Sequence, residues 1–266
     1  MQAADRPVLH LNGPRLSRAF EALIDGAERA GGIEALAQAV RAKSALFAEA
    51  FAPGGTCPDE AGFRALCAFM APVRRRVGPW LAANSYAALR EAVGLLVADG
   101  RDTGTTDARI ERFTARFPRD RAHRWVRDLA AEVLHNTWPE LYPLMNRWVW
   151  DNGANTGVLR EIWHAADDTA SIDVADGYAT FVVLREELAE FLSRNGVFRD
   201  VLAYVDMLSA QVYAEYVTTQ GASFLRAEFN EPDDPLAHAR RMLGLDGIER
   251  GLVRQDRAAA IALLNG

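Results

Sequence analysis

The feature that most constrains the fold of this chain is a helical periodicity that runs along almost its whole length. Apolar residues recur every three or four positions, in segments rich in Ala, Leu, Glu and Arg, which favour helices. Glycine, proline and short polar stretches separate these segments and give each predicted helix a defined end. We expect helices at about 14–30, 33–51, 59–77, 79–98, 106–117, 119–136, 138–150, 156–168, 176–194, 198–217, 221–230, 235–243 and 247–264.

This pattern predicts an all-α protein, an orthogonal or layered bundle of about ten or more helices. Only the Val-rich stretch 178–184 suggests a strand, and the residues that follow it favour helix. A chain of 266 residues suits one large domain or two small ones, and we expect a single helical domain over 1–266. A softer division is possible near 100–106, where turn-forming residues gather.

Charge and composition narrow the range of partners. The net charge of −6 lacks the basic surplus that is typical of nonspecific nucleic-acid binding, so nucleic acid is an unexpected partner, although Arg74, Arg75 and Arg76 offer a local basic cluster. Cys57 and Cys67 have neither a disulfide-framework pattern nor metal-binding spacing. The N-terminus has no apolar signal-peptide region, and no apolar stretch approaches the roughly 20 residues of a membrane span. We therefore expect a cytoplasmic protein that does not enter a membrane.

Two Glu-x-x-His motifs, Glu132/His135 and Glu161/His164, raise the possibility of a di-metal centre. Residues at i and i+3 share one face of a helix, and paired motifs of this kind build carboxylate-bridged metal sites in helical bundles. Glu215, beside an apolar stripe, is a fifth candidate ligand. The Asp-x-x-x-His spacing at 234–238 is also similar to that of haem-oxygenase-like di-iron oxidases. This resemblance implies a non-haem oxidase or oxygenase that uses Fe or Mn.

The helical geometry of both motifs argues against that alternative. The apolar stripe of the helix at 119–136 is centred near Val126, Leu129 and Val133, which places Glu132 and His135 on the polar side. In the next motif, Glu161 and His164 also point away from the apolar face of their helix. Because ligands inside a bundle must project into its interior, these four side chains can bind a metal only if both helices are buried on all sides.

A second alternative is a Mg-dependent enzyme that uses the acidic stretch at 167–176. Asp167 and Asp168 resemble the Asp-Asp motif of class I isoprenoid synthases, which are also all-α proteins and bind Mg²⁺ there. The second motif of that family is matched only incompletely by 205–215.

The remaining feature is a cluster of five Trp residues between positions 125 and 163. If the stretch 138–150 is helical, Trp148 and Trp150 are about 200° apart and cannot share one face. The cluster is either a Trp-rich core or a surface for a partner, since Trp contributes large apolar area and an N–H donor. We assign Trp138, Tyr142, Trp148 and Trp150 as candidate contacts to a protein partner or small-molecule ligand.

Searches for nucleotide-binding, hydrolase and zinc motifs find none in this sequence, so no catalytic residue is assigned. The function expected from the sequence is therefore that of an intracellular binding protein built on a Trp-rich helical core. Whether the protein is also an enzyme is left open at this point.

Overall fold

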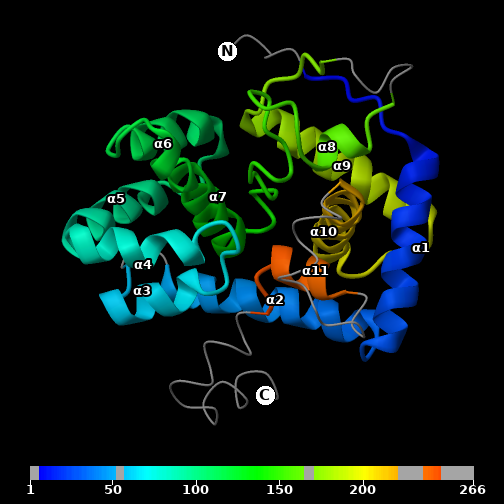
Figure 1. Ribbon diagram of the computed structural model, residues 1–266, viewed down its shortest axis with the longest axis horizontal. Helices are drawn as coiled ribbons and strands as arrows, with labels where there is room; N and C mark the ends of the chain where they lie inside the picture. Colours follow the sequence, from blue (N-terminus) through cyan, green and yellow to red (C-terminus); the bar gives the residue numbers. More distant parts are fainter. Residues whose placement is uncertain (1–5, 52–56, 165–170, 221–235, 247–266) are drawn as a thin grey trace. The chain divides into compact units, whose positions relative to one another are not determined.

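The computed structural model describes residues 6–51, 57–164, 171–220 and 236–246 (Figure 1). Within these ranges the regular structure is helical, with two isolated β-bridges and no strand, which confirms the prediction of an all-α, multi-helix protein. The α-helices are α1 (Gly13–Arg29), α2 (Ile33–Ala50), α3 (Glu60–Cys67), α4 (Arg74–Ala83), α5 (Tyr86–Ala98), α6 (Thr106–Thr114), α7 (Trp125–Thr137), α8 (Val158–Glu161), α9 (Tyr178–Arg194), α10 (Val201–Gln220) and α11 (Ala237–Met242).

The chain forms two compact units, and each is discontinuous in sequence. Unit 1 comprises 1–38 and 145–242, and unit 2 comprises 39–144 and 243–266. The stretch 100–106, where the sequence suggested a softer division, lies inside unit 2. Compactness of each unit does not decide whether it folds alone, so the expectation of a single domain stays a prediction.

Several helix ends follow directly from local sequence. The Asn12 side chain accepts a hydrogen bond from the backbone N–H of Arg15 at the start of α1, and Asp59 accepts one from Gly62 at the start of α3. The segment predicted as one helix over 59–77 is divided into α3 and α4, as expected of Pro72, which has no N–H to donate. Residues 178–184 form the first turns of α9, which confirms the helix predicted at 176–194.

Helix α10 is the centre of unit 1 and packs against α1, α8, α9 and α11. Every residue from Val205 to Val212 on α10 is buried, including the polar Asp206, Ser209 and Gln211. Because its polar residues are buried together with its apolar ones, α10 has no single apolar face. The other helices of unit 1 therefore pack around α10.

Unit 2 is organised around α7, which packs against α5 and α6. Its side chains from Ala130 to Thr137 are all buried, on every side of the helix. A helix buried all round requires internal partners for its polar side chains. The side of α7 that the sequence predicts to be polar is therefore buried as well.

The predicted helix over 138–150 is absent, and turns and extended backbone take its place. The Thr137 hydroxyl donates to the Val133 carbonyl at 2.6 Å, within α7. Pro139 and Pro143 remove backbone donors and disfavour helix at the residues before them, which explains why the local apolar pattern does not continue as helix. Of the helix predicted at 156–168, the described residues 156–164 contain only α8, and 165–168 lie outside the described residues.

Candidate functional site

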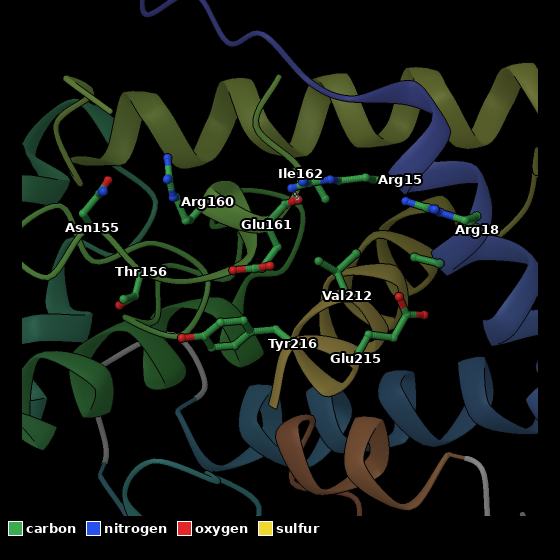
Figure 2. A pocket seen from close by; sticks show the side chains of 11 residues that line it. Arg15, Arg18, Asn155, Thr156, Arg160, Glu161, Ile162, Val212, Glu215 and Tyr216 are labelled. Carbon is green, nitrogen blue, oxygen red and sulfur yellow. Dashed lines mark hydrogen bonds between the residues drawn. The ribbon is translucent and has the colours of Figure 1, made fainter. Parts of the chain in front are cut away.

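A pocket of about 520 Å³ lies within unit 1, between α1, the segment 155–162 and α10 (Figure 2). Three arginines, two glutamates and several hydroxyl or amide side chains share it with a small apolar floor. The lining residues are Arg15, Arg18, Ala19, Asn155, Thr156, Arg160, Glu161, Ile162, Val212, Glu215 and Tyr216.

One wall of the pocket is fixed by pairing between the N-terminal segment and the residues after α8. The Asn12 N–H donates to the Ile162 carbonyl at 2.7 Å, and the His164 N–H donates to the His10 carbonyl at 2.6 Å. The Arg15 guanidinium adds a bond of 2.7 Å from Nη1 to the Glu161 carbonyl, the dashed line in Figure 2. These bonds hold the start of α1 against α8, so the two walls of the pocket keep a defined separation.

The loop 151–156 forms a second wall and is closed by backbone hydrogen bonds. The Asp151 N–H donates to the Thr156 carbonyl at 2.9 Å, and the Thr156 N–H returns a bond of 3.3 Å. Asn155 has a left-handed backbone (φ 50°), and its side-chain oxygen accepts from the Ile172 N–H at 3.2 Å. Gly157 follows at φ 119°, where a Cβ would lie 2.7 Å from the Val149 carbonyl oxygen, so only glycine fits.

Several hydrogen-bond donors in the pocket have no partner among the residues that the structure describes. They include the guanidinium of Arg18 and the hydroxyls of Thr156 and Tyr216; Arg18 and Thr156 are exposed and Tyr216 is half-buried. Figure 2 shows the Tyr216 hydroxyl directed toward Thr156 and the Arg18 side chain entering from α1. A ligand that supplies acceptor atoms therefore meets donors from three separate segments of the chain.

The chemistry of the lining favours an anionic group. A guanidinium binds carboxylate or phosphate oxygens through two parallel N–H bonds, and tyrosine and threonine hydroxyls donate to the same oxygens. Three Arg and two Glu leave the pocket with one net positive charge. Ala19, Ile162 and Val212 are buried beneath it and offer an apolar surface for the body of a small molecule.

The first Glu-x-x-His motif is buried in unit 2, where its side chains already have partners. Glu132 Oε2 accepts from Lys43 Nζ at 3.2 Å and from Asn136 Nδ2 at 2.8 Å. His135 Nδ1 donates to the Tyr142 carbonyl at 2.8 Å. Glu132 and His135 are only 1% and 5% exposed, because α7 is enclosed on all sides. The condition of burial on all sides is thus met at this motif, but its side chains contact Lys43, Asn136 and the Tyr142 carbonyl.

The second motif belongs to unit 1. Glu161 lines the pocket, His164 is exposed, and Glu215 lies across the pocket on α10, where Gln211 Nε2 donates to its Oε1 at 3.0 Å. In the described ranges no group of three or more His, Cys, Asp or Glu side chains is arranged to hold a metal ion. The acidic residues Asp167, Asp168 and Asp234 lie outside the described residues.

The four aromatic residues assigned as partner contacts are all buried. Trp150 Nε1 donates to the Val174 carbonyl at 2.9 Å, and the Trp148 ring lies 5.6 Å from that of Tyr213. In unit 2 the Tyr142 hydroxyl donates to the Gly100 carbonyl at 2.5 Å, beside the ring of Trp138. Their burial is that of core residues, and their part in binding a partner stays a prediction.

The sequence reasoning missed the pocket and its arginines. Arg15 and Arg18 are three positions apart on the first helix and therefore share one face, a signal that was present in the sequence. Nothing local connects this face with Thr156 or Tyr216, because their proximity depends on how α1, the 155–162 segment and α10 pack.

No family model, curated protein or solved structure was found to match this chain. Among the described helices, none combines the length and apolar character of a membrane-spanning segment.

Proposed function

We propose that the protein binds a small anionic molecule, one that carries a carboxylate or phosphate group, in the unit 1 pocket. The observation that supports this most directly is the presence of the Arg18, Thr156 and Tyr216 donors in one pocket of about 520 Å³. A volume of this size suits an organic ligand better than a bare inorganic ion. The proposal develops the binding function expected from the sequence and places it at different residues.

The expected arrangement has the anionic group at Arg18, with hydrogen bonds from the Thr156 and Tyr216 hydroxyls to further acceptors of the ligand. The apolar body of the ligand covers Val212 and Ile162. Glu161 and Glu215 disfavour ligands with several negative charges, since like charges in a pocket repel.

Calorimetric titration of the full chain with a panel of carboxylates and phosphate monoesters tests this proposal, with inorganic phosphate as the minimal probe. We expect at least one organic anion to bind more tightly than inorganic phosphate. Arg18→Gln should weaken its binding about tenfold or more, since a charge-assisted bond contributes about 1.5–3 kcal/mol.

The matched control is Arg199→Gln, because Arg199 is also an exposed arginine of unit 1 but lies outside the pocket. It should leave the affinity and the melting temperature unchanged. Absence of binding across the panel, or equal losses in the two variants, would overturn the proposal.

A further inference from the structure

The segment Leu243–Asp246, with the sequence Leu-Gly-Leu-Asp, is held by unit 2 through three different kinds of contact. Leu243 and Leu245 are both buried. The residues that hold the segment lie about 170 to 200 positions earlier in the chain, so the contact resembles that of a protein with a peptide.

The first contact is a hydrogen bond to the backbone of the segment. Lys43 Nζ donates to the Leu243 carbonyl at 2.8 Å, and the same ammonium lies 3.2 Å from Glu132 Oε2. Lys43 is the single lysine among 30 basic residues, and it is 5% exposed. A buried ammonium with a fixed carboxylate partner is a rigid donor for one backbone carbonyl.

The second contact selects glycine. Gly244 has φ 75°, and a Cβ there would lie 1.8 Å from the Phe69 carbonyl oxygen. Both the backbone conformation and the close approach exclude every other residue at this position.

The third contact selects an acidic side chain. Arg74 binds Asp246 through two bonds, Nη1 to Oδ1 at 2.5 Å and Nη2 to Oδ2 at 3.1 Å. Both side chains are only 17% exposed, so this bidentate pair is shielded from much of the solvent. Together, the three contacts recognise a backbone carbonyl, a glycine and a carboxylate within four residues.

We propose that Lys43, Phe69 and Arg74 form a peptide-recognition surface for Leu-Gly-Leu followed by an acidic residue, which the chain's own Leu243–Asp246 occupies. The partner that fits is a protein that presents this tetrapeptide. Because a tethered segment competes at an effective concentration of about millimolar order, such a partner binds only when the internal copy is displaced. The inference is independent of the ligand proposed for unit 1.

The test uses the full chain and a fluorescent peptide with the sequence of residues 241–246, with binding measured by anisotropy. Gly244→Ala prevents the internal segment from docking in its present form. We expect this variant to bind the peptide at least tenfold more tightly than the parent protein does. It should not bind the same peptide with alanine in place of the glycine.

Gly196→Ala is the matched control, because Gly196 also has a left-handed backbone (φ 87°) but a Cβ there meets no atom within 4 Å. It should bind the peptide as weakly as the parent. Equal binding by parent and Gly244→Ala, or equal binding of the two peptides, would overturn the proposal.

A second variant serves if Gly244→Ala does not fold. Arg74→Glu should reverse the preference at the last position, so that a peptide that ends in Arg binds more tightly than one that ends in Asp. If the preference does not reverse, Arg74 does not select the acidic residue and the inference fails.

Discussion

Lys43 Nζ lies 3.2 Å from Glu132 Oε2, and both side chains are almost completely buried. Asn136 Nδ2 donates to the same carboxylate oxygen at 2.8 Å. The Glu of the first Glu-x-x-His motif is thus held by an ammonium and an amide. In this pair, a residue that the sequence offers as a candidate metal ligand is part of the internal structure of unit 2.

Removal of one member of this ion pair should destabilise the protein strongly. Lys43→Met leaves the Glu132 carboxylate buried without its cation, and we expect a loss of about 3–5 kcal/mol in the free energy of unfolding. Denaturant unfolding measures this loss. The double variant Lys43→Met with Glu132→Leu should recover much of the stability; a double variant as unstable as the single one would show that the uncompensated charge is not the cause.

The hydroxyl of Tyr142 links two buried groups, since it accepts from Arg109 Nη2 and donates to the Gly100 carbonyl. Tyr142→Phe should lower the free energy of unfolding by about 1–3 kcal/mol, because both groups lose a buried partner. Tyr216→Phe is the control, since Tyr216 is only half-buried and its hydroxyl has no partner within the described structure. Equal melting temperatures for the two variants would contradict this assignment.

The ring of Trp138 packs directly over Gly100. A Cβ at Gly100 would lie 2.1 Å from the Trp138 ring, so Gly100→Ala should displace the ring and lower the free energy of unfolding by about 1–3 kcal/mol. Thermal unfolding measures the change in melting temperature caused by Gly100→Ala. The control is Gly13→Ala, because a Cβ at Gly13 meets no atom within 4 Å. A change of melting temperature no larger at Gly100 than at Gly13 would be inconsistent with this packing.

Burial raises the pKa of the Cys67 thiol, and the neighbouring Cys57 raises it further. At pH 8 we expect Cys67 to react with a disulfide reagent much more slowly in the native protein than in urea, since only the thiolate is nucleophilic. Rapid native labelling at Cys67, located by mass spectrometry of its peptide, would contradict this expectation.

The same shift has a consequence for stability. The pKa of the Cys67 thiol is higher in the folded protein than in the unfolded chain, where it is near 8.5. The contribution of this thiol to the free energy of unfolding is therefore complete below the unfolded pKa and is lost as the pH rises above it. Cys67→Ala should therefore flatten the fall in stability between about pH 8.5 and 10.5, and an unchanged slope would exclude Cys67 as its source.

The sequence by itself determined the local structure of this protein. The positions of α1, α2, α9 and most other described helices were predictable, because apolar periodicity and capping residues such as Asn12 act within a few positions. The same local reasoning failed at 138–150, where an apolar pattern suggested a helix but Pro139 and Pro143 and the surrounding core impose turns.

Only the tertiary structure decided which polar residues are internal and which converge. Helical projection placed Glu132 on a polar face, but the chain encloses that face and brings Lys43, 89 positions earlier, to the carboxylate. The pocket likewise combines Arg18, Thr156 and Tyr216 from segments far apart in sequence. Periodicity describes one helix at a time, whereas the partner of a charge depends on long-range packing, which no local pattern encodes.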